Sequence, residues 1–213
     1  MNYSDLKTPY INNDLIKTKA ESFRNKYWDQ EFPINIEKII DFKLKINIIP
    51  IPNLEKICNT DTLITSDWES LYVDDNLYND ERRQNRLRFS LAHEIGHYIL
   101  HKEFYSTWKI NSIEKFYSFL DLIPREQYSY LETQANKFAT YFLVPRQALE
   151  ERFRIEYKNV EKIKNFGNID INTLKSYIAN PLSKFFGVSP ESIEIALSDL
   201  EFFKNQALQK QKE

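Results

Sequence analysis

Hydrophobic side chains recur every three or four residues along most of this chain, which is the period of helices with one buried face. The spacing predicts helices over about 12–27, 35–42, 81–101, 125–143, 147–157, 171–186 and 190–203. Shorter apolar runs predict three strands, at about 44–51, 63–66 and 70–73, with a turn at 74–76. Residues 102–124 are less regular and predict a loop containing a short helix. The pattern therefore predicts an α+β fold, in which a small sheet packs against helices.

The length of 213 residues suits one ordinary domain with a small appendage. We expect a main domain over residues 1–160 and a helical C-terminal extension over 161–213 that packs on it. Ser189 followed by Pro190 is typical of a helix start, so the last two helices should flank the turn at 187–189. The Lys- and Gln-rich tail after Phe203 is compatible with disorder.

Composition excludes several classes of function. The net charge of -2 gives no sign of a nucleic-acid-binding surface. Cys58 is the single cysteine, so disulfides within the chain and cysteine-based zinc sites are excluded. Three isolated glycines cannot form a phosphate-binding loop. The first residues do not resemble a signal peptide and no apolar run is long enough for a membrane span, so we expect a cytoplasmic protein.

The chemistry is concentrated at residues 93–97, which read H-E-I-G-H. On a helix, His93 and His97 lie one above the other, about 5–6 Å apart, so both imidazoles can reach one ion. Glu94 lies beside them on the same opening without being a ligand. A carboxylate there can take a proton from a metal-bound water, whose pKa the ion lowers to roughly 7. An ordinary helix can also carry this short pattern by chance.

A catalytic zinc needs a third protein ligand. His101 lies about 12 Å along the helix axis from His93, too far for both to bind one ion, and it is better suited to a capping or outer role. Glu132 is the better candidate, although its spacing alone favours a solvated helix glutamate. Ala135 and Ala139 would let its helix approach Gly96 closely. Asn136, on the same face as Glu132, could hold a ligand histidine by its distal N–H.

Residues 86–101 resemble the ImmA/IrrE family of metallopeptidases, whose typical motif is R-F-x-x-A-H-E-L-G-H-x-x-x-H. A second family motif, E-x-x-A-N/D-x-F-A followed by an apolar run and a proline, matches residues 132–145, and F-G-V-S matches 186–189. The resemblance implies that His93, His97 and Glu132 bind the metal and that Glu94 is the general base. It also implies a minimal gluzincin-like peptidase domain with a short helical C-terminal part. Ile95 replaces the usual leucine.

The function we expect is a zinc metallopeptidase, with Mn²⁺ as an alternative to Zn²⁺. The resemblance implies a protein substrate such as a helix-turn-helix repressor encoded nearby, whose cleavage would derepress genes. The main alternative is a non-catalytic, metal-stabilised binding module that acts as an anti-repressor or antitoxin-like partner. A DNA-binding regulator is disfavoured because the last helix carries acidic residues and no Lys or Arg. We expect no direct contact with nucleic acid and no membrane partner.

Two further features leave alternatives open. Tyr128, Tyr130 and Tyr141 are all near Glu132 in sequence, and any of them could stabilise an oxyanion.

A basic run leads into the motif helix and could contact an acidic substrate, although a solvated helix face is favoured. It consists of Arg82, Arg83, Arg86 and Arg88.

Overall fold

The computed structural model describes residues 6–28, 31–162 and 169–203. The chain divides into two compact units, one of Met1–Glu31 with Asn35–Phe142 and one of Phe32–Ile34 with Leu143–Glu213. The division into 1–160 and 161–213 stays a prediction. The tail after Phe203 lies outside the described residues.

The first unit contains a three-stranded sheet in the order β1-β3-β2. Its strands are β1 (Asn47–Ile51), β2 (Thr62–Ile64) and β3 (Ser70–Asp74). β1 runs parallel to β3, and β2 runs antiparallel to it with Leu63 opposite Tyr72. β2 is therefore an edge strand, and the N–H and C=O groups of Thr62 and Ile64 point away from β3.

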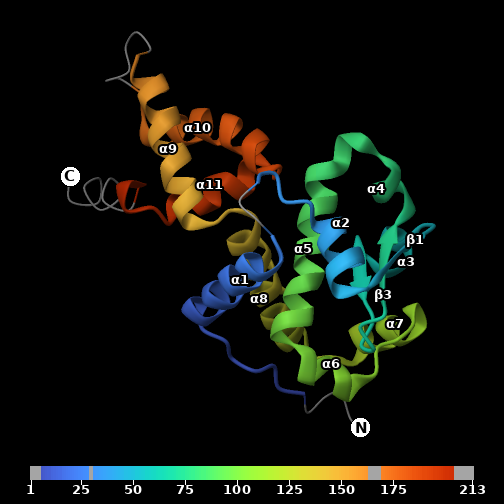
Figure 1. The fold of residues 1–213 in the computed structure, drawn as a ribbon. Helices are drawn as coiled ribbons and strands as arrows, with labels where there is room; N and C mark the ends of the chain where they lie inside the picture. The colour runs from blue at the N-terminus through green and yellow to red at the C-terminus, as the bar shows by residue number, and fades with distance from the viewer. Residues whose placement is uncertain (1–5, 29–30, 163–168, 204–213) are drawn as a thin grey trace. The chain divides into compact units, whose positions relative to one another are not determined.

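Helices make up most of the first unit (Figure 1). They are α1 (Asn13–Tyr27), α2 (Ile36–Lys38) continued by the π-helical segment η2 (Ile39–Leu44), α3 (Leu54–Cys58), α4 (Asp75–Asn79), the 3-10 turn η3 (Glu81–Arg83), α5 (Gln84–Leu100), α6 (Lys102–Trp108), α7 (Ile113–Leu122) and α8 (Arg125–Leu143). With the small sheet, they give the α+β fold that the hydrophobic pattern predicted.

Helix α5 lies at the centre of this unit, between the sheet on one side and α1 and α8 on the other (Figure 1). Leu91 and Ile95 of its apolar stripe are fully buried. On α1, Phe23 packs against Phe138 and Phe142 of α8, with ring centroids 6.1 and 5.6 Å apart. The buried faces of α1 and α8 thus fix α8 relative to the rest of the unit, which matters because α8 carries Glu132.

Short elements depart from the predictions. The first strand begins at Asn47 and not at about 44, because the chain remains helical to Leu44 and ends that helix at Lys45, where φ is 60°. The turn expected at 74–76 is the start of α4, since the Asp74 carboxylate accepts hydrogen bonds from the N–H groups of Asn76 and Leu77. Residues 102–124 form two helices, α6 and α7, where one short helix was expected.

The described residues of the second unit form three helices, α9 (Arg146–Glu161), α10 (Ile171–Phe186) and α11 (Pro190–Ser198). Gly187 ends α10 with φ 65°, the left-handed conformation that glycine adopts most easily. The Ser189 side chain caps α11 by accepting from the N–H of Ser192, as predicted. The Phe153 ring packs against those of Phe202 and Phe203. Among the described residues, no helix is both long and apolar enough to cross a bilayer.

Candidate metal centre

The two histidines of the H-E-I-G-H segment lie on one face of α5, one turn apart. Their Nε2 atoms are 2.9 Å from each other. His97 is almost completely buried, with 2% of its side chain exposed, whereas 13% of His93 is exposed. Both imidazoles therefore direct their Nε2 atoms to one point at the rim of a pocket.

Glu132 of α8 faces this point from the opposite side. Its Oε2 lies 3.2 Å from His93 Nε2, and its Oε1 lies 3.4 Å from His97 Nε2. Two ligand atoms that each sit 2.0–2.1 Å from a tetrahedral zinc are roughly 3.3 Å apart, so these spacings are close to those of a zinc site. One ligand atom from each residue lies within 4.8 Å of the other two. Two histidines and a glutamate are also a donor set that zinc uses in peptidases, so the residues fit a metal ion.

A close approach of two helices brings Glu132 to the histidines. A Cβ built on Gly96 would lie 3.0 Å from both the Cα and the carbonyl oxygen of Ala135, and 3.3 Å from its Cβ. The absence of a side chain at Gly96 and the small side chain at Ala135 thus allow α5 and α8 to touch along their backbones, as the sequence predicted. Glu132 lies one turn before Ala135 on α8, so this contact sets its distance from His93 and His97.

We therefore expect Gly96→Ala to weaken metal binding. The added methyl group must push α8 away by a few tenths of an ångström, which moves Glu132 with it. Alanine favours a helix by about 1 kcal/mol over glycine, but overpacking against a backbone costs typically 1–3 kcal/mol. Calorimetric titration with Zn²⁺ should show weaker binding than in an Asn85→Ala control, which places alanine at an exposed position of α5. Equal affinity in the two variants would contradict this account of the helix contact.

The outer nitrogens of both histidines also have partners. His93 Nδ1 lies 2.9 Å from Asn136 Oδ1, the contact expected from the sequence. An amide oxygen accepts only, so His93 keeps a proton on Nδ1, and Nε2 is the nitrogen through which it can bind a metal. His97 Nδ1 lies 3.0 Å from Nδ1 of His101, whose Nε2 lies 2.9 Å from Gln134 Oε1.

The charges in this cluster depend strongly on one another. Burial opposes ionisation of both Glu132 and His93, but their hydrogen bond and mutual attraction outweigh it. Glu132 therefore raises the pKa of His93 to about 9, and His93 and His97 hold the pKa of Glu132 well below its usual range. Burial and the neighbouring His97 lower the pKa of His101 to about 3. The Glu132 carboxylate thus favours a positive charge at the point where it meets the two histidines.

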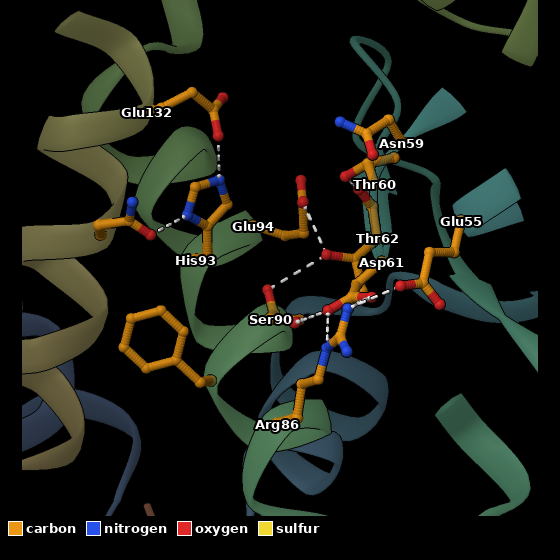
Figure 2. Close-up of a pocket in the computed structure, with 12 residues that line it drawn as sticks. Glu55, Asn59, Thr60, Asp61, Thr62, Arg86, Ser90, His93, Glu94 and Glu132 are labelled. Carbon is orange, nitrogen blue, oxygen red and sulfur yellow. Dashed lines mark hydrogen bonds and ion pairs between the residues drawn. The ribbon is translucent and has the colours of Figure 1, made fainter. Parts of the chain in front are cut away.

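Glu94 lies beside this cluster, and its carboxylate is held by the edge strand β2. Its Oε1 accepts a hydrogen bond from the Thr62 hydroxyl at 2.8 Å, and its Oε2 accepts one from the N–H of Ile64 at 2.9 Å. Figure 2 shows the Glu94 side chain directed to the side of the pocket that β2 forms. Sequence reasoning placed Glu94 at the site but missed Thr62 and Ile64, which no local pattern marks.

The cluster opens into a pocket of about 300 Å³. The far wall is a polar network, in which Arg86 donates to both carboxylate oxygens of Asp61, at 2.6 and 2.7 Å, and to Glu55 at 3.0 Å (Figure 2). Arg82 pairs with Asp80 and Arg83 with Glu55. Arg82, Arg83 and Arg86 of the basic run therefore contact carboxylates of this chain.

The tyrosines near Glu132 differ in position. Successive residues of an α-helix are about 100° apart, so Tyr130 and Tyr141 lie roughly on the opposite face of α8 from Glu132, whereas Tyr128 shares its face. The Tyr130 hydroxyl donates to Glu126 in solvent. Burial and the charge of Glu132 raise the pKa of Tyr128. Tyr105 of α6, which sequence reasoning missed, is buried with its ring centroid 5.2 Å from that of His97.

These observations define a class: a helix-rich α+β domain with a candidate metal site of two histidines and a glutamate. Residues 77–198, more than half of the chain, match the IrrE N-terminal-like domain, a peptidase family. The chain belongs to this family, in agreement with the resemblance found in its motifs. It is therefore a peptidase-type domain, and the family implies a metal. A comparison with curated protein sequences gave no significant match.

A Mycobacterium tuberculosis transcriptional regulator has a similar structure, with a TM-score of 0.55 and 17% sequence identity. The similarity covers 90% of this chain and 57% of that protein, so the chain spans little more than half its length. At this identity the likeness shows a shared fold.

Proposed function

We propose that the protein is a zinc-dependent endopeptidase, with Mn²⁺ as an alternative ion, that acts on a protein substrate. The observation that supports this most directly is the convergence of His93, His97 and Glu132 from two helices, with the Glu94 carboxylate beside them. When bound, the ion would polarise the scissile carbonyl and lower the pKa of a water to about 7.

The residues of the chain supply the proton transfers. Glu94 takes the proton of the attacking water and later delivers it to the leaving amine. The Thr62 hydroxyl and the Ile64 N–H hold both oxygens of Glu94, so the carboxylate keeps one orientation during these steps. Tyr128, which shares the Glu132 face of α8, is the tyrosine best placed to donate a hydrogen bond to the developing oxyanion.

The proposed substrate is a helix-turn-helix repressor encoded near this protein, cut in the cytoplasm to derepress genes. Membership of a peptidase family and the likeness to a transcriptional regulator support a link between proteolysis and gene control. Direct binding to nucleic acid is not part of the proposal. Helix α11 carries Glu191 and Glu194 and no Lys or Arg, so it would repel phosphates.

To test the proposal, the purified full chain is loaded with Zn²⁺ and incubated with the neighbouring repressor. We expect intact-mass spectrometry to show two fragments whose masses sum to the repressor plus one water. A chelator should stop cleavage, and added Zn²⁺ should restore it. Stable binding of the intact repressor without any cleavage would overturn the peptidase and favour the binding-module alternative.

A further inference from the structure

A buried chain of hydrogen bonds leads from His97 to the backbone of the N-terminal segment. His97 Nδ1 contacts His101 Nδ1 at 3.0 Å, and His101 Nε2 contacts Gln134 Oε1 at 2.9 Å. The Gln134 amide nitrogen then donates to the carbonyl oxygen of Pro9 at 3.0 Å. Only 1% of His101 and 7% of Gln134 are exposed to solvent. Apart from His97, the residues of this chain are outside the ligand group and the pocket lining described above.

The direction of this chain follows from its last member. The Pro9 carbonyl can only accept, so the NH₂ of Gln134 must point to it and the Gln134 oxygen must face His101. That oxygen also only accepts, so His101 carries its proton on Nε2. A buried imidazolium between an amide and another imidazole would be costly, so His101 is neutral and its Nδ1 has a lone pair.

His97 is the next residue to be fixed. Because His101 Nδ1 accepts, His97 must donate through its own Nδ1–H, and the lone pair of its Nε2 then points to the place where Glu132 and His93 converge. The opposite tautomer would direct an N–H to that place and would exclude a metal. His93 and His97 thus both carry a proton on Nδ1. Asn136 alone holds it there in His93, whereas His101 and Gln134 together do so in His97.

We propose that His101 and Gln134 are positioning residues that hold His97 in the tautomer and ring orientation needed for metal binding through Nε2. The inference rests on the proposed function only in taking His97 as a metal ligand. It gives His101 a specific role in orienting His97. A buried histidine without this role would only fill space in the core. It also assigns a task to the N-terminal segment, which fixes the Gln134 amide through Pro9.

The structure offers a matched control for Gln134. Gln127, on the same helix, also binds the N-terminal segment, since it accepts from the N–H of Thr8 through Oε1 and from the Thr8 hydroxyl through its backbone oxygen, both at 2.7 Å. A variant at Gln127 loosens the same segment without touching a histidine. Gln134→Met and Gln127→Met therefore separate the hydrogen-bond chain from general anchoring of the segment.

The experiment measures Zn²⁺ affinity by competition with a chromophoric chelator, in protein shown to be folded by circular dichroism. Loss of an outer partner of a ligand typically costs 10–100-fold in affinity. We expect a loss of that size for His101→Phe and about 10-fold for Gln134→Met. We expect less than about 3-fold for Gln127→Met. His101→Asn should retain most of the affinity, because its amide oxygen can accept from His97.

A double-mutant cycle shows whether His101 acts through His97. In a His97→Ala background, His101→Phe should have no further effect on Zn²⁺ affinity. Equal losses in both backgrounds, wild-type affinity in His101→Phe, or equal losses in Gln134→Met and Gln127→Met would each overturn the proposal. If His101→Phe does not fold, the two glutamine variants decide alone. A wild-type protein that binds Zn²⁺ but cleaves nothing would instead defeat the peptidase and leave this inference intact.

Discussion

Glu94→Gln is expected to lower the rate of peptide cleavage by about 1,000-fold while leaving Zn²⁺ affinity unchanged within about twofold. General acid–base catalysis contributes typically 10²–10⁴-fold, and an amide at this position can neither take nor deliver the proton. The side chain is not one of the three groups that converge as candidate ligands, so metal binding should persist. The variant therefore separates chemistry from binding.

The structure indicates that this substitution is tolerated. The glutamine oxygen can accept from the Ile64 N–H in place of the carboxylate. Its NH₂ group can donate to Thr62 Oγ1, whose hydroxyl proton can turn to the backbone oxygen of Ser90, already 3.4 Å away. Glu94→Ala would instead leave the buried Ile64 N–H without an acceptor, which costs about 1–3 kcal/mol, so its loss of activity would be harder to interpret.

Steady-state cleavage and Zn²⁺ titration are measured together for Glu94→Gln and for Glu103→Gln, an exposed carboxylate on α6 that serves as control. Cleavage above about one tenth of the wild-type rate would rule out Glu94 as the general base. Loss of the metal would assign Glu94 to the ligands. Repressor inactivation that persists in cells when cleavage is abolished would favour the binding-module alternative over the peptidase.

Periodicity predicted the long helices well because each buries a continuous apolar stripe. The predicted bounds of α8 and α10 agree with the structure, 125–143 and 171–186. Short elements were harder to predict. Helix α4 depends on Asp74, which also accepts a hydrogen bond from the N–H of Glu55 on α3, a contact between segments distant in sequence. Five-residue helices have little periodicity, so their formation is decided by such tertiary contacts.

In the candidate site, too, residues close in sequence could be predicted, whereas residues brought together by tertiary contacts could not. His93, Glu94 and His97 are close in sequence, so helical geometry alone places them on one opening. Gly96 signalled a close helix contact through its cost in a helix interior, but it could not identify Glu132 as the facing residue. That assignment needed the family resemblance.

The groups that orient the site were harder still to predict. Thr62, Ile64, Tyr105 and Gln134 act through contacts between elements, and a threonine at the start of a short strand or a glutamine on a helix has no local signal. For Ile64 the relevant group is the backbone N–H, which any residue would supply.

Removing Glu132 is the other change with a large expected effect. We expect Glu132→Ala to lower Zn²⁺ affinity by at least about 100-fold, because loss of a mere outer partner already costs 10–100-fold. Its fold should survive, since 30% of the Glu132 side chain is exposed and α8 is held by the buried Phe138 and Phe142. Calorimetric titration checks the affinity and thermal unfolding checks the fold.

Two further variants show what the site requires of this carboxylate. Glu132→Gln keeps the length of the side chain and removes its charge, whereas Glu132→Asp keeps the charge but shortens the reach across the contact between α5 and α8. If the carboxylate binds the ion, both should lose affinity, while Glu126→Gln, an exposed glutamate on the same helix, should not. Wild-type affinity in Glu132→Gln would instead make Glu132 an ordinary solvated glutamate. The Gly96–Ala135 contact would then need another explanation than the placement of a ligand.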